Sequence, residues 1–306
     1  MVRVNYGVIL QAYESINQEI DSEFADWGIA TEASTEDMLQ GTATNGNATT
    51  NSSDGAKSSS INPAAKSKFI QTLRRIIEKI GSLIEAAKRK INNNMKLMWQ
   101  TDRGFRAALV NAQKTAQPLK GFNALTYQYN ESYLERTMRS LMQGFMAEFE
   151  DLGNVKLIGE DVDTEEISFE RSIKNVFAKA TSSQDIETVE GMTREIVSQY
   201  RGEKQEMTFS QSQIPALQQI VAKGSSSSAF QDYMNPIEKQ YDNLKAKASR
   251  YQQVNSNADM RRVSALMNCT TKLYNAALSI SKVYYELKVE RYLAAREALK
   301  KFYNLS

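Results

Sequence analysis

The stretch from Lys66 to Trp99 constrains the fold more than any other part of this sequence, because its apolar residues recur at steps of three and four. That spacing places them on one face of an α-helix. The apolar stripe consists of Phe69, Leu73, Ile76, Ile77, Ile80, Leu83, Ile84, Ala87 and Ile91. An isolated helix cannot bury such a stripe. We therefore expect it to pack on the rest of the chain, on a partner or on an anionic surface.

Basic residues fill much of the rest of this helix, and only Glu78 and Glu85 oppose them. The net charge of the whole chain is only +2, so the positive charge is local. The sequence gives two candidate partner-binding sets. The cations are Lys68, Arg74, Arg75, Lys79, Lys88, Arg89, Lys90 and Lys96. The apolar set is Phe69, Leu73, Ile76, Ile80, Leu83 and Ile84. The plain alternative is a surface helix whose stripe joins the core and whose charges face water.

The residue types that most enzymes use are scarce. The chain has no histidine, which removes the commonest general base and the commonest metal ligand. Cys269 is the only cysteine, so we interpret it as a packing residue on a helix. No glycine-rich phosphate loop is present. The acidic segment 160–166 lacks the glycine and distal glutamate of a calcium loop, so we interpret it as a solvated loop. We predict a protein that is not an enzyme, with no catalytic residues, cofactor or metal.

Two targeting signals are also missing from the sequence. Residues 1–10 have no long apolar run and no small-residue cleavage site, so we expect no signal peptide. No segment approaches the uninterrupted apolar length of a transmembrane helix.

Composition shifts along the chain predict a mainly α protein with a small β component, an α+β fold with long amphipathic helices, a small central sheet and a C-terminal antiparallel helical hairpin. The predicted segments are an acidic helical leader at 1–40, a flexible low-complexity linker at 41–64, the basic helical segment at 65–113, a small α+β domain at 114–224 and the hairpin at 225–306.

Within these segments the patterns predict individual elements. The basic helix loosens at Asn92–Asn94, and Thr101 or Asp102 caps a further helix through Gln113. The expected strands are 122–129, 155–158 and 205–209. The expected later helices are 131–151, 169–180, 184–200, 214–222, 235–254 and 259–299.

The order of these segments resembles the internal head proteins of large tailed bacteriophages. The resemblance rests on a polar leader and linker, the basic helix KFIQTLRRIIEKIGSLIEAAKRKI, a D-x-x-F-like turn at Asp102–Phe105, the aromatic strand GFNALTYQY and the helical C-terminus TKLYNAALSISKVYYELKVERYLAAREALKKFY. It covers roughly 66–129 and 235–303, and residues 150–230 do not contribute to it.

The resemblance implies a virion structural protein, made in the host bacterial cytoplasm and placed inside the capsid in many copies. It implies contacts with the major capsid protein or other virion proteins, with non-specific DNA phosphate contacts as a further option. We expect no membrane partner. The leader is similar to head-protein segments that are trimmed during maturation. The alternative hypothesis is a secreted or peripheral bacterial helical protein that binds anionic membranes through the basic amphipathic helix.

Overall fold

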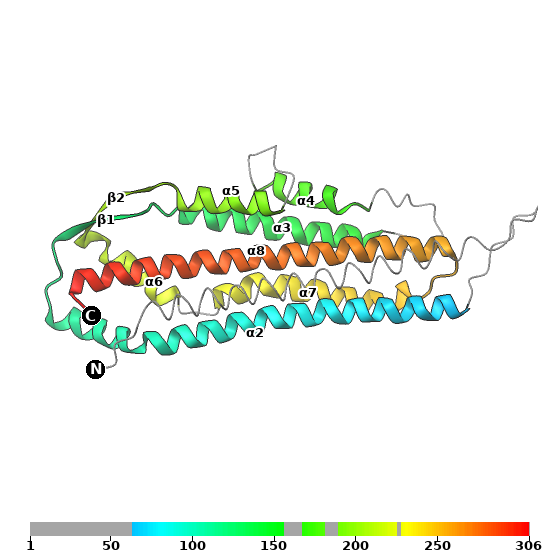
Figure 1. The fold of residues 1–306 in the computed structure, drawn as a ribbon, viewed down its shortest axis with the longest axis horizontal. Helices are drawn as coiled ribbons and strands as arrows, with labels where there is room; N and C mark the ends of the chain where they lie inside the picture. Colours follow the sequence, from blue (N-terminus) through cyan, green and yellow to red (C-terminus); the bar gives the residue numbers. More distant parts are fainter. Residues whose placement is uncertain (1–62, 156–166, 181–188, 225–227, 306) are drawn as a thin grey trace, which may run out of the picture. The chain divides into compact units, whose positions relative to one another are not determined.

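A computed structural model of the chain describes residues 63–155, 167–180, 189–224 and 228–305 (Figure 1). The predicted class, mainly α with a small β component, is confirmed. The elements in chain order are α2 (Pro63–Thr115), β1 (Gly121–Tyr127), α3 (Glu131–Asn154), α4 (Phe169–Ala178), α5 (Val189–Arg201), β2 (Lys204–Ser210), the 3₁₀ turn η2 (Gln211–Gln213), α6 (Ile214–Gly224), α7 (Ser228–Tyr251) and α8 (Asn257–Tyr303).

Helix α2 is continuous, which corrects the expected break at Asn92–Asn94 and the expected new start at Thr101 or Asp102. An asparagine inside a helix costs only about 0.7 kcal/mol relative to alanine. Buried Ile91 before this segment and buried Phe105 after it give the helix packing contacts on both sides. Tertiary packing therefore outweighs the weak local preference.

The chain forms two compact units, and five helices, α2, α3, α4, α7 and α8, contribute to both. Unit 1 takes its described residues from 63–87, 146–155, 167–173 and 237–276; unit 2 takes its own from 88–145, 174–180, 189–224, 228–236 and 277–305. This division differs from the consecutive segments predicted from the sequence, because composition marks linkers but does not show where a long helix passes from one core to the next.

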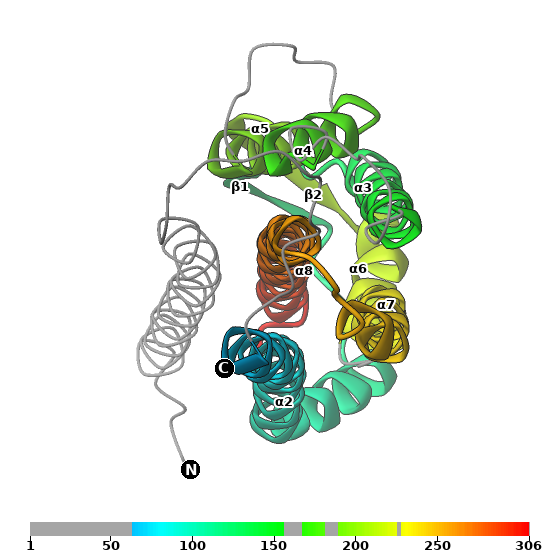
Figure 2. The same cartoon turned by 90° about the vertical axis from the view of Figure 1, so that its right-hand side faces the viewer.

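The first part of α2 packs in the core of unit 1, where Leu73, Ile76 and Ile80 are buried. Figure 2 faces this unit and shows its part of α8 with α2, α3 and α7 around it. Gly81 is buried inside α2, where a Cβ atom would lie 2.1 Å from Tyr241 Oη of α7. Glycine is therefore the residue that lets Tyr241 approach this helix.

The turn between α7 and α8 in unit 1 is held by a capping box. Asp259 Oδ2 accepts hydrogen bonds from the backbone N–H groups of Asn255 and Ser256, both at 3.0 Å. Ser256 Oγ accepts from the Asp259 N–H at 3.0 Å. These bonds satisfy N–H groups that a helix start leaves without partners. The sequence predicts a break between helices 235–254 and 259–299, and the structure has it at 252–256.

Unit 2 contains the antiparallel ribbon of β1 and β2, in which Gly121 pairs with Ser210 and Tyr127 with Lys204. The Phe122 ring stacks on Phe209 at 5.0 Å between centroids and meets Phe302 of α8 edge-on at 4.9 Å. One face of the ribbon therefore packs on a hydrophobic cluster formed by α2, α6 and α8. Its buried members are Phe105, Leu109, Ile214, Leu217, Val221, Tyr292, Ala295, Ala298, Leu299 and Phe302.

Several predicted boundaries need correction. Helix α7 begins at Ser228 rather than Asn235, so Pro236 lies inside it. Val155 belongs to no strand. Several predicted parts lie outside the described residues: the leader, nearly all of the linker, residues 156–158, the acidic segment 160–166, residues 184–188 and residues 225–227.

Candidate functional site in helix α2 and the polar network of unit 2

The basic residues of α2 in unit 1 lie opposite the apolar stripe. Lys68, Arg74 and Arg75 are exposed, and Lys79 is half-buried. Arg74 Nη2 donates a hydrogen bond to Gln252 Oε1 at 3.0 Å. Glu78 and Glu85 are the exposed carboxylates of this part of α2. The solvent-facing side of the helix therefore carries both positive and negative residues, and the exposed cations precede the carboxylates in the sequence.

The remaining predicted cations belong to unit 2. Lys88 is half-buried and Arg89 is exposed. The side chains of Lys90 and Lys96 lie outside those that the structure describes.

The apolar stripe is part of the hydrophobic core. The candidate residues Phe69, Leu73, Ile76, Ile80, Leu83 and Ile84 are all buried. This corrects the interpretation of the stripe as a partner surface, because its area is already covered in the folded chain. Contact through α2 has to use the charged face instead.

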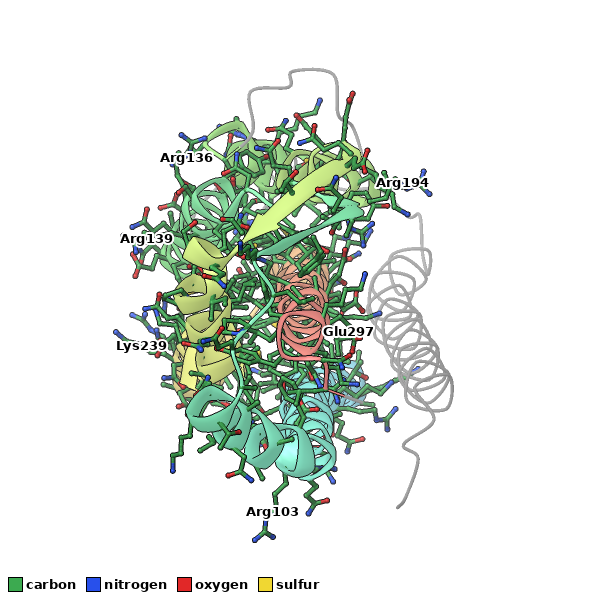
Figure 3. All side chains as sticks on the ribbon, turned by 90° about the vertical axis from the view of Figure 1, so that its left-hand side faces the viewer. Arg103, Arg136, Arg139, Arg194, Lys239 and Glu297 are labelled. Atoms are coloured by element: carbon green, nitrogen blue, oxygen red, sulfur yellow. The ribbon has the colours of Figure 1, made fainter. Side chains whose placement is uncertain are left out.

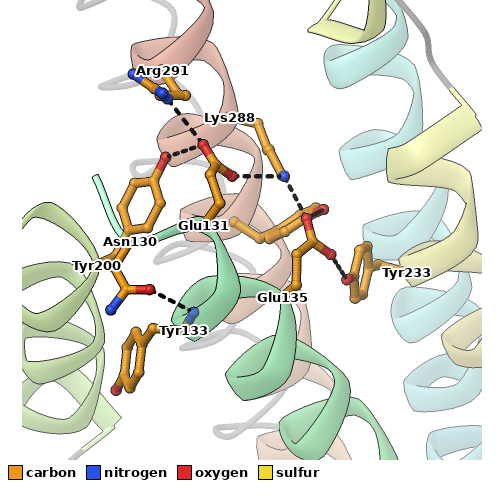
Figure 4. A network of polar contacts seen from close by, with 9 residues as sticks. Asn130, Glu131, Tyr133, Glu135, Tyr200, Tyr233, Lys288 and Arg291 are labelled. Atoms are coloured by element: carbon orange, nitrogen blue, oxygen red, sulfur yellow. Dashed lines mark hydrogen bonds and ion pairs between the residues drawn. The ribbon is translucent and has the colours of Figure 1, made fainter. Parts of the chain in front are cut away.

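The densest polar cluster of the described residues lies in unit 2 and was not expected from the sequence (Figure 4). Glu131 and Glu135 stand one turn apart on α3, facing Lys288 and Arg291 of α8. Lys288 Nζ lies 3.4 Å from Glu131 Oε2 and also pairs with Glu135 Oε1. Arg291 Nε lies 3.1 Å from Glu131 Oε1. Two cations of one helix therefore bridge two carboxylates of another.

Tyrosine hydroxyls donate the remaining hydrogen bonds to these carboxylates. Tyr200 Oη of α5 donates to Glu131 Oε1 at 3.3 Å. Tyr233 Oη of α7 and Tyr284 Oη of α8 donate to Glu135, at 3.4 and 3.3 Å. Burial raises the pKa of all three phenols, so they remain neutral donors at physiological pH.

A second branch is centred on Glu290 of α8. Tyr129 Oη donates to Glu290 Oε1 at 3.2 Å. Arg201 donates to Glu290 Oε2 from Nε at 3.0 Å and from Nη2 at 2.5 Å. The Arg291 guanidinium lies over the Tyr129 ring at 4.8 Å, which joins this branch to the first.

The network pairs Glu131, Glu135 and Glu290 with Lys288, Arg291 and Arg201, so its charges balance. Its hydrogen bonds join α3, α5, α7 and α8 inside unit 2. Each carboxylate already accepts bonds from several neighbours. The arrangement therefore acts as a cross-link between helices that fixes their register.

The D-x-x-F turn that carries part of the resemblance has a different role from the expected cap. Asp102 is buried inside α2, with Oδ1 2.9 Å from Arg296 Nε of α8. The Arg296 guanidinium also lies over the Phe105 ring, 5.0 Å from its centroid. The spacing of three residues therefore places an anion and an aromatic ring beside one arginine. In the same turn of α2, Arg103 points outward, as Arg136 and Arg139 do on α3 (Figure 3).

A small cavity in unit 1 has room for about one water molecule, with a volume near 30 Å³. Phe149, Tyr251 and Tyr274 contribute to its walls. On its rim, Lys247 Nζ donates to the Gly153 carbonyl at 2.8 Å, near the end of α3. A lysine at this position complements the negative end of the helix.

None of the helices in the described parts of the chain combines the length and apolar character needed to cross a membrane. Within the same ranges, acidic and cysteine side chains form no group suited to a metal ion. Comparison of the chain with protein-family models, with curated proteins and with solved structures gives no match.

Proposed function

We propose that this protein is a non-enzymatic structural component of a tailed-phage virion, which lines the inside of the capsid and contacts the capsid shell. The observation that supports this function best is the amphipathic character of α2 in unit 1. Its stripe is buried, while Lys68, Arg74 and Arg75 are held at the surface by a rigid helix. The order of leader, basic helix, aromatic strand and helical C-terminus agrees with the same function.

Fixed cations on a helix suit an acidic protein face, and a partner of that kind is recognised by charge rather than by an apolar pocket. The backbone of packaged DNA is the second partner that these cations fit. Such contact would involve phosphates, since Phe69, the aromatic residue between Lys68 and Arg74 in the sequence, is buried in the core and cannot stack on bases.

Mass spectrometry of purified phage particles tests the location. The proposal requires the protein in mature heads or in proheads, and its absence from both would overturn the proposal.

A charge-neutralising variant tests the surface. Changing Lys68, Arg74 and Arg75 together to Gln should weaken retention of the protein on assembled capsid shells by about tenfold or more, because contacts between complementary charges are lost. The matched control changes Arg171, Lys239 and Arg261 of the same unit, which are also exposed, to Gln. Equal weakening by both variants would show a general charge effect and contradict a role for α2. If DNA is the partner, the slope of log K against log salt should fall by roughly 2–3 for the α2 variant alone.

The membrane-binding alternative would need the apolar stripe, and the burial of that stripe counts against it. Substituting Asp for Ile76 and Ile80 would not test the alternative, because both side chains belong to the core and the variant would unfold. The variant with Lys68, Arg74 and Arg75 changed to Gln tests the alternative instead. Flotation of the wild type with anionic vesicles but not with neutral ones, lost in that variant, would favour the alternative.

A further inference from the structure

The two-stranded ribbon of unit 2 has an edge that lacks the usual protection. Among the described residues, only those of β2 form backbone hydrogen bonds with Gly121–Tyr127. A strand edge with free N–H and C=O groups can pair with another strand, and natural proteins usually protect such edges with charged residues, proline or a covering element. The edge of β2 carries Lys204 and Glu206. Strand β1 has the sequence GFNALTY and carries neither a charge nor a proline.

The same strand carries the most exposed large apolar side chain of the described residues. Leu125 is 63% exposed, more than Leu119 or Val110. Exposure alternates along β1, so Leu125 lies on the face opposite the one that packs on α8. Its cross-strand partner is Glu206, which leaves Leu125 without an apolar neighbour across the ribbon.

We propose that β1 pairs in antiparallel orientation with β1 of a second copy of this chain, giving a four-stranded sheet across a twofold axis. A second copy is the occupant that fits this strand, because it offers a neutral edge and an exposed leucine of its own. Pairing β1 with β1 places no like charges opposite each other, because the strand is neutral. Pairing through two β2 edges would bring charged residues to the contact.

The exposed leucine sets the register. A twofold axis at Leu125 places this residue opposite its own copy and Asn123 opposite Tyr127, all on the outer face. An apolar cross-strand pair then replaces two exposed leucines. The contact is small compared with the roughly 1,200–2,000 Å² of a stable interface, so the dimer is weak and depends on concentration. This inference goes beyond the proposed function, since it concerns contacts between copies and is tested on purified protein alone.

Sedimentation of the purified full-length chain over a wide concentration range tests the pairing. We expect dimerisation by the wild type and a dissociation constant about tenfold higher for Leu125→Lys, which brings two like charges together. Val110→Lys is the matched control, because it makes the same change at a position on α2 that is 48% exposed. Wild type that stays monomeric, or Leu125→Lys that dimerises as the wild type does, overturns the proposal.

Oxidative cross-linking tests the register. With Cys269 changed to Ala, Leu125→Cys places two thiols opposite each other, where paired Cβ atoms lie about 4.5–5.5 Å apart. Asn123→Cys is the control, because its two copies would be offset by four residues, about 13 Å along the strands. Cross-linked dimers from Leu125→Cys and not from Asn123→Cys support the pairing. The reverse pattern, or cross-linking by neither variant, contradicts it.

Discussion

Asp102 and Arg296 form an ion pair that is nearly closed to solvent, with 6% and 4% of their side chains exposed. The carboxylate comes from the last third of α2 and the guanidinium from the last third of α8, both in unit 2. Burial raises the pKa of Asp102, and the neighbouring cations of Arg296, Arg106 and Lys300 oppose that rise. A buried pair of this kind helps to fix the register of two helices.

Removing one partner of this pair should destabilise unit 2 strongly. Asp102→Ala leaves the Arg296 guanidinium in the core without the buried Asp102 carboxylate, and we expect a loss of about 3–5 kcal/mol in the free energy of unfolding. Replacing both residues by apolar ones, Asp102→Leu with Arg296→Met, should cost much less than the single change. Urea denaturation of the three proteins measures both effects. A double variant less stable than Asp102→Ala would contradict this account.

Two glycines of α2 should respond in opposite directions to the same substitution. Gly81→Ala places a Cβ atom 2.1 Å from Tyr241 Oη and 2.5 Å from Tyr241 Cζ, so we expect a loss of about 1–3 kcal/mol through overpacking. Gly104→Ala meets nothing within 4 Å and should gain about 0.5–1 kcal/mol from helix propensity. Thermal unfolding of the two variants provides the comparison.

The clash at Gly81 can be separated from other causes with a second change. In a Tyr241→Ala background the space beside Gly81 is open, so Gly81→Ala should become neutral or stabilising. A loss that persists in this background would point to a cause other than Tyr241.

The sequence was sufficient for the helical class and for strands β1 and β2, because their patterns are strong and local. It failed at Asn92–Asn94 and Pro236, where local signals favour a break and packing maintains the helix. The sequence also does not show why Gly81 lies inside a helix, because its reason is the approach of Tyr241 from α7. In each case the prediction followed a local preference, whereas a tertiary contact decides the structure.

The polar network illustrates the same limit for the site. Glu131 and Glu135 at a spacing of four, and Lys288 and Arg291 at a spacing of three, each indicate one helix face. Neither spacing shows that the two faces meet, because the helices are far apart in the sequence. The basic face of α2 was predictable because it belongs to one helix, whereas the burial of its stripe depended on the fold around it.

Lys288 should contribute more to stability than a lysine in an exposed pair. Lys288→Met leaves Glu131 and Glu135 without their shared cation inside a half-buried network, and we expect a loss of about 1–3 kcal/mol. Lys245→Met is the control, because Lys245 and Asp242 form an exposed pair at 2.7 Å. The control should leave the free energy of unfolding nearly unchanged, because an exposed ion pair contributes little to stability.

A second substitution distinguishes charge from packing at Lys288. Lys288→Met leaves Glu131 paired with Arg291 but takes the cation from Glu135. Adding Glu135→Gln removes that carboxylate and should restore part of the lost stability. Equal losses for Lys288→Met with and without Glu135→Gln would show that the methylene chain, and not the ammonium group, carries the effect.

Cys269 should make the stability of unit 1 depend on alkaline pH. Burial raises the pKa of this thiol to about 11 in the folded chain, above its ordinary value of about 9. Between these two values the unfolded chain releases the proton and the folded chain keeps it, so the free energy of unfolding falls as the pH rises from about 9 to 11. The thiol accounts for a fall of about 2–3 kcal/mol over that range.

Buried tyrosines add to the same fall, so the measurement is the difference between the wild type and Cys269→Ala in urea titrations at several pH values. The free energies of unfolding of the two proteins should differ by a constant amount up to about pH 9, and the difference in favour of the wild type should shrink above that pH. Parallel curves of this free energy up to pH 11 would mean that the buried thiol does not titrate as described.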